Sequence, residues 1–150
     1  YIPYFAEANV NINQPALLIA SSAAHETAHY LGVAREDEAN FVSYLACTYS
    51  LDASVRYSGT MLALINCANQ LYASDAELYR RLVSEYYSEG MLRDLRDYNA
   101  YWDSFEGPIE EAVDNMNDNY LKFNKQENGV KSYGMMVDLL LAYYAKGSAQ

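Results

Sequence analysis

The stretch His25-Glu26-Thr27-Ala28-His29 decides how this chain of 150 residues is interpreted, and it holds both histidines of the sequence. It reads H-E-x-x-H. On a helix, residues four apart lie on one face, so the two imidazoles can each give a nitrogen to one divalent metal. Glu26 projects beside that metal, where its carboxylate can take a proton from metal-bound water. The motif therefore predicts a Zn²⁺ site with His25 and His29 as ligands and Glu26 as the general base. The competing interpretation is a pair of core histidines on an amphipathic helix.

The residues on both sides of the motif indicate that it lies on a helix with a sharp end. Pro15 suits the first turn of this helix, with Asn13 available as its cap. Gly32 stands three residues after His29, where a left-handed C-terminal residue is expected. The short turn at Gly32 should then pack a second helix, over residues 35–49, antiparallel to the first.

The third metal ligand is predicted on that second helix. Its apolar face, read at helical spacing, continues backward onto Glu38 and comprises Phe41, Val42 and Leu45. A carboxylate on a buried face is costly unless something compensates its charge, and a metal would do so. Glu38 is therefore the predicted third ligand. The alternatives are Glu36, which is expected to face solvent, and a more distant acid, with Glu38 then a surface residue paired to Arg35.

The remaining sequence predicts a mainly α fold, a single compact domain over residues 1–150 with about six or seven helices. Residues 8–13 alternate apolar and polar side chains, so they predict at most a short N-terminal strand. Asp52 is expected to cap a helix, and Ser74-Asp75-Ala76-Glu77 reads as a capping box. The further helices are predicted over 52–73, 74–90, 93–106, 108–125 and 132–146.

The composition of the chain excludes some classes of function. The formal net charge of −10 argues against a nucleic-acid partner, which needs clustered lysine and arginine. No apolar run approaches the roughly 20 residues that cross a bilayer. The first residue is Tyr1 rather than methionine, so the chain is expected to be a processed or excised piece. Cys47 and Cys67 are predicted to be buried thiols, with a single disulfide as the alternative.

Several segments in a fixed order carry a resemblance to a known family. They run from His25 to Ser50, and include Tyr57-Ser58-Gly59, Asn124 to Gln126 and Gly129 to Gly134. Together they make the chain, from Tyr4 to Tyr144, resemble a bacterial family catalogued as a domain of unknown function. The members of that family look like membrane-anchored zinc peptidases with transmembrane helices ahead of an H-E-x-x-H helix. The segment Glu38-Ala39-Asn40-Phe41 is also similar to the one after the motif in peptidases that cleave phage-type repressors.

The resemblance implies a zincin-like helical domain with an acidic third zinc ligand, which supports Glu38. It also implies that the protein is anchored in the membrane by a segment outside this chain, and that this domain lies outside the cytoplasm. Two departures stand out, since the chain has no transmembrane segment and only one candidate strand where a complete zincin has a small sheet. The anchor is therefore expected to be missing from this piece.

These observations predict a zinc metallopeptidase that hydrolyses a peptide or protein substrate. Tyr133, next to Gly134, is a candidate for stabilising the oxyanion of a tetrahedral intermediate or contacting substrate, with ordinary packing as the alternative. The competing function is a non-catalytic helical interaction module, or a pseudo-peptidase that retains the motif. Metal content separates the two classes first.

Overall fold

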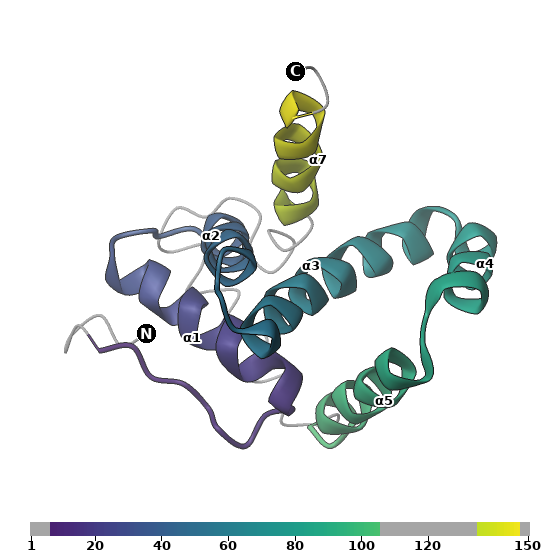
Figure 1. Cartoon of the computed structure of the whole chain (residues 1–150), viewed down its shortest axis with the longest axis horizontal. Coiled ribbons are helices and arrows are strands. Elements are labelled where there is room, and N and C mark those ends of the chain that lie inside the picture. The colour runs from purple at the N-terminus through teal and green to yellow at the C-terminus, as the bar shows by residue number, and fades with distance from the viewer. Residues whose placement is uncertain (1–6, 106–134, 148–150) are drawn as a thin grey trace.

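The structure is a computed structural model that describes residues 7–105 and 135–147, and it is mainly helical, as predicted (Figure 1). The described residues form six helices and no strand, so residues 8–13 are not the strand that their alternation suggested. The predicted helix over 108–125 lies outside the described residues. The six helices are α1 (Ala16–Tyr30), α2 (Glu36–Thr48), α3 (Ala53–Ser74), α4 (Ala76–Tyr86), α5 (Glu89–Asp103) and α7 (Met135–Gly147).

Helices α1, α2 and α3 pack against one another and form the body of the domain (Figure 1). Helix α4 contacts α3, and α5 returns toward the start of α1. The side-chain amide of Asn11 donates to the Tyr101 hydroxyl at 2.9 Å, which ties the segment before α1 to α5. Helix α7 packs on α2 and α3. The motif helix α1 is therefore supported from two sides.

Two apolar clusters hold these helices together. The first joins α1 to α3 through Leu17, Leu18, Met61 and Ile65, and α5 covers it with Met91, Leu95 and Tyr98. The second joins α7 to α2 through buried Tyr44, Met136 and Leu140. Burying such side chains contributes roughly 1.5–3 kcal/mol each relative to leaving them exposed. The core is thus built from side chains of α1, α2, α3, α5 and α7.

A buried serine junction brings α1, α2 and α3 close together. Ser43 Oγ donates to the carbonyl oxygen of Ser21 at 2.6 Å, and Ser58 Oγ accepts from the Ser21 backbone N–H at 2.9 Å. All three serines are buried. Gly59 lies beside this junction, where a Cβ atom would collide with the Cβ of Cys47. Small residues at these positions let the backbones approach.

The helix ends explain where the predicted boundaries held and where they were wrong. Asp52 caps α3 as expected, accepting from Ser54 N–H at 2.7 Å. Asp75, rather than Ser74, caps α4, because Ser74 still belongs to α3. The helix predicted to reach Gly90 ends at Tyr86, and Ser88 caps a new helix by accepting from Met91 N–H at 3.2 Å. The residue before α1 is Pro15, and Asn13 does not cap this helix.

Two further expectations concern membranes and cysteines. Among the described residues, no helix is both long and apolar enough to cross a bilayer. Cys47 and Cys67 are both free thiols, the first buried and the second half-buried. Burial raises the pKa of both thiols, which keeps them protonated and inert near neutral pH.

Candidate metal centre

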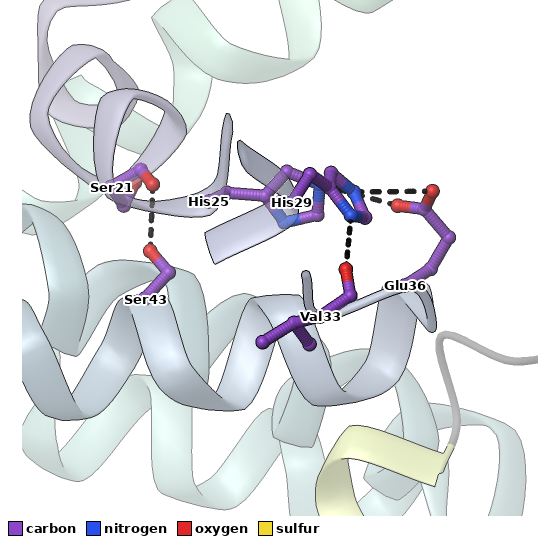
Figure 2. A network of polar contacts seen from close by, with 6 residues as sticks. All are labelled: Ser21, His25, His29, Val33, Glu36 and Ser43. Carbon is purple, nitrogen blue, oxygen red and sulfur yellow. Dashed lines mark hydrogen bonds and ion pairs between the residues drawn. The ribbon is translucent and has the colours of Figure 1, made fainter. Parts of the chain in front are cut away.

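The two motif histidines meet at the C-terminal end of α1, and their Nε2 atoms lie 3.0 Å apart (Figure 2). His29 Nδ1 lies 2.7 Å from the carbonyl oxygen of Val33. This contact requires the chain to reverse just after α1, and Gly32 allows it by adopting a φ of +99°. With Nδ1–H donating to Val33, the Nε2 atom of His29 carries the lone pair that a metal would need.

Glu36 is the carboxylate that lies beside both histidines. It is the first residue of α2, and its Oε2 and Oε1 atoms lie 3.2 Å from His25 Nε2 and 3.4 Å from His29 Nε2. Figure 2 shows the carboxylate turned toward the two rings. The donor atoms of His25, His29 and Glu36 all lie within 4.8 Å of one another. The structure therefore brings together one carboxylate and the two predicted imidazoles.

Glu38, the predicted third ligand, does not join this cluster. Its side chain is 51% exposed against 20% for Glu36, and its carboxylate lies 3.5 Å from Arg35 Nε. The prediction took the apolar stripe of α2 as its buried face, but Val42 is exposed. The fully buried residues of α2 are instead mostly small or polar, and comprise Asp37, Ala39, Asn40, Ser43, Tyr44 and Cys47. The face of α2 that meets α1 is therefore determined by how closely the two helices pack, and not by how apolar the side chains are.

The electrostatics of the cluster favour an ionised carboxylate among the histidines. Burial alone would raise the pKa of Glu36, but hydrogen bonds and charge from His25 and His29 outweigh burial and lower it to about 2. The hydrogen bond to Glu36 raises the pKa of His29 against the opposing effect of burial, and the Val33 carbonyl adds to the rise. Glu36 is therefore an anion at any pH near neutral, as a metal ligand must be.

Glu26 and His25 both line a cleft of about 630 Å³. The cleft runs between α1, α3 and α5, with Ile65, Asn66 and Trp102 among its walls. The Nδ1 atom of His25 is buried and has no hydrogen-bond partner in the part of the chain that the structure describes. The predicted general base thus lies at the border between the histidine cluster and an open cleft.

The donor set fits a zinc ion. Zinc in proteins takes nitrogen and oxygen ligands at about 2.0–2.2 Å, which places neighbouring ligand atoms of a tetrahedron about 3.3 Å apart. The two imidazole Nε2 atoms lie 3.0 Å apart, and the short contacts of Glu36, at 3.2 and 3.4 Å, are made by its two different oxygens. With one ligand atom taken from each residue, all three atoms lie within 4.8 Å of one another. Three protein ligands would leave a fourth position open, which is the arrangement of catalytic rather than structural zinc.

Sequence reasoning missed two parts of this region. Glu36 was set aside because a first-turn acid normally faces solvent, although its position just after the turn at Gly32 brings it back to His29. The cleft was missed altogether, and the signal for it was the pair Asn66 and Asn69 on the face of α3 that also carries Ile65. Tyr133, the candidate for oxyanion stabilisation, lies outside the described residues.

Comparison with known proteins gives a family and no closer relative. The chain belongs to the family described as "Protein of unknown function (DUF3810)", whose model matches residues 1–141. No curated protein and no solved structure matches the chain.

Proposed function

We propose that this member of the DUF3810 family is a zinc-dependent peptidase in which His25, His29 and Glu36 hold the metal and Glu26 is the general base. The observation that carries the proposal is the convergence of three metal-ligating groups on one point beside the cleft. A carboxylate that follows the first histidine and lines the cleft is then placed to act on a substrate bound there.

Each of these residues has a distinct task. His25 and His29 present Nε2, and the Val33 carbonyl fixes the tautomer of His29 by accepting from Nδ1. Glu36 supplies a negative charge that persists at neutral pH. Bound zinc would polarise the scissile carbonyl and make water a better nucleophile at neutral pH. Glu26 takes the proton from the attacking water and passes it to the leaving amine.

Amide hydrolysis is preferred over other metal-assisted hydrolyses because a glutamate directly follows the first histidine, as in zinc peptidases. This step rests on analogy with the motif and therefore needs a direct test. The family resemblance points the same way. Membrane anchoring of the full-length protein stays a prediction of that resemblance, which cell fractionation of the full-length protein would test.

The testing experiment measures metal and activity in the same samples. Chelator-stripped protein is titrated with Zn²⁺, the bound metal is quantified, and the loaded protein is screened against casein and a fluorogenic peptide library. We expect one zinc per chain, and peptide cleavage that stops on chelation and returns with zinc. Protein that binds no zinc would support the interaction module, and zinc binding without cleavage of any peptide would support the pseudo-peptidase.

The non-catalytic alternative has its own observation in the structure. Glu36 makes ionic contacts with the Nε2 atoms of both histidines, so the cluster has a metal-free arrangement. In that arrangement the motif would only pin the start of α2 to the end of α1. Zinc titration distinguishes the two, because an ion pair of this kind gains nothing from added metal.

A further inference from the structure

The cleft beside Glu26 has a chemical character that indicates what it binds. Four carboxamide side chains line it, and they come from the segment before α1, from α2 and from α3: Gln14, Asn40, Asn66 and Asn69. A carboxamide offers both hydrogen-bond donors and an acceptor, so it can pair with either half of a peptide unit. Four of them in one cleft are suited to a ligand that presents N–H and C=O groups alternately.

Two of these amides have groups left over after their contacts within the protein. Gln14 Oε1 accepts from Ser22 Oγ at 3.0 Å, while its Nε2 atom is buried without a hydrogen-bond partner in the described part of the chain. Asn66 Nδ2 donates to the Leu62 carbonyl at 2.9 Å, which leaves its Oδ1 atom as an acceptor. A buried donor without a partner is costly, so Gln14 Nε2 favours a ligand that brings an acceptor to it, and Asn66 Oδ1 can accept from an N–H of the same ligand.

Without metal, the charge of the cleft disfavours an acidic ligand. Among the described residues that line it, Glu26 is the one carboxylate, and there is neither lysine nor arginine. The chain as a whole carries a formal net charge of −10. A carboxylate entering this cleft would lose hydration without gaining a positive partner.

The wall formed by α5 is aromatic. Tyr98 and Trp102 both line the cleft, and their rings pack edge to face with centroids 6.2 Å apart. Trp102 is 50% exposed, so it presents an aromatic surface that a ligand side chain can cover. Aliphatic residues of α1 and α3 continue this apolar wall, among them Leu18, Leu62 and Ile65.

We infer that this cleft is a substrate subsite for an uncharged peptide segment with an apolar or aromatic side chain. Gln14 and Asn66 pair with the peptide backbone, and the side chain lies against Trp102. The inference rests on the proposed peptidase function for its biological meaning. Its chemistry needs no metal, so it can be tested with the zinc removed.

The test measures peptide binding to chelated, ¹⁵N-labelled protein by NMR, following the side-chain amide signals of asparagine and glutamine. The probes are N-acetyl-Phe-Leu-amide, N-acetyl-Asp-Asp-amide and N-acetyl-Lys-Lys-amide. We expect the neutral peptide to bind at least about tenfold more tightly than the acidic one. It should also bind more tightly than the basic one, because its apolar side chains cover the wall formed by Trp102 and Leu62. Shifts should centre on Asn66, Asn69 and the Trp102 indole. Equal binding of all three probes, or tightest binding of either charged probe, would overturn the inference.

Two variants and a matched control assign the contacts. Asn66→Leu removes the acceptor and should weaken the neutral peptide roughly fivefold, the effect of one neutral hydrogen bond. Trp102→Ala, at a half-exposed position, should abolish the preference for a phenylalanine over an alanine side chain. Asn99→Leu changes an exposed asparagine of α5 away from the cleft and should bind as the parent does. If Asn66→Leu and Asn99→Leu bind equally and Trp102→Ala keeps the preference, the cleft is not the subsite.

Failure of the subsite and failure of the peptidase proposal give different results. Metal-free protein that binds the neutral peptide but never cleaves it when loaded with zinc keeps the subsite and rejects the peptidase. Protein that cleaves peptides with rates independent of Asn66 and Trp102 keeps the peptidase and rejects the subsite.

Discussion

The Ser43 hydroxyl in α2 donates a hydrogen bond to the carbonyl oxygen of Ser21 in α1, and this contact sets the register between the two helices. Two turns back along α2 from Ser43 lies Glu36, and one and two turns forward along α1 from Ser21 lie His25 and His29 (Figure 2). The helices run in opposite directions, so the buried serine contact and the histidine cluster both belong to the interface between α1 and α2. The buried contact between Ser43 and Ser21 therefore fixes the position of the Glu36 carboxylate.

The first prediction concerns the identity of the third ligand. Glu36→Ala should weaken zinc binding by about 100-fold or more, because it removes a carboxylate that contacts both histidines. Glu38→Ala should leave the affinity near the parent value, since this side chain is half exposed and pairs with Arg35. Competition with a fluorescent zinc chelator measures both. The reverse order of affinities would return Glu38 to the site.

The second prediction separates proton transfer from metal binding. Glu26→Gln should keep zinc at the parent stoichiometry, because the amide has nearly the same size and Glu26 is not a ligand. Peptide hydrolysis should fall about 10²–10⁴-fold, since an amide cannot accept the proton of the attacking water at neutral pH. His25→Ala should lose metal and activity together. A Glu26→Gln protein that cleaves at the parent rate would rule out the proposed mechanism.

The third prediction tests the close approach of α2 and α3. Gly59→Ala should destabilise the fold by about 1–3 kcal/mol, because the added methyl group collides with Cys47 and lies 3.3 Å from the Tyr44 carbonyl oxygen. Gly90→Ala is the matched control within α5, where the nearest heavy atom to the new methyl is 3.8 Å away. The control should be neutral or stabilise by about 0.5–1 kcal/mol. Urea unfolding compares the two, and equal midpoints would contradict the packing.

The fourth prediction gives the pH window of the metal-free cluster. The pKa of Glu36 is lowered from 4.5 to about 2, so its stabilisation is present above pH 4.5 and is lost as the pH falls toward 2. The pKa of His29 is raised above 6.5, so its stabilisation is complete below pH 6.5 and is lost as the pH rises through the raised value. The Tm difference between chelated parent and Glu36→Gln should therefore be largest between these limits.

Thermal unfolding at about pH 3, 5.5 and 8.5 in the presence of chelator measures that window. Glu38→Gln is the control, since its side chain lies away from the histidines, and it should show no comparable maximum. A parent-to-variant difference that grows steadily toward alkaline pH would contradict an ionic contact with His29.

The fifth prediction is that the domain stays folded without metal. Two apolar clusters join helices α1, α2, α3, α5 and α7, and neither includes His25, His29 or Glu36. Zinc fingers differ because the metal supplies most of their folding energy. Far-ultraviolet circular dichroism should change little on adding chelator, with the Tm lowered. Loss of most of the helical signal would show that the metal holds the fold.

Local signals predicted most of the fold. The H-E-x-x-H spacing, the glycine after it and the aspartate at residue 52 each act within one turn of chain, and the structure places a helix, a left-handed residue and a cap at these points. The prediction that Ser74 caps α4 was wrong. Both Ser74 and Asp75 can cap a helix by local chemistry, and Asp75 does so because α3 extends through Ser74.

The position of Glu36 beside the histidines could not be predicted in the same way, since it depends on which face of α2 meets α1. Apolar periodicity identifies a helix face that becomes buried, but not the element that buries it. Phe41 and Leu45 do pack in an apolar cluster, and that cluster is shared with α7. The face toward α1 was selected by small and polar side chains such as Ser43, whose partner Ser21 lies 22 residues earlier. A pairing of that kind is tertiary information, and no window of sequence around Glu36 contains it.

Helices α4 and α5 differ from the others in having no fully buried residue. Segments with few buried contacts open locally at a lower free energy than the core, so amide exchange should be faster in these two helices than in α1 to α3. Helix α5 carries the aromatic wall of the cleft, whereas both histidines and Glu36 lie on α1 and α2. The fold therefore predicts slow amide exchange around the histidine cluster and faster exchange in the α5 wall, so that the wall can move while His25, His29 and Glu36 stay in place.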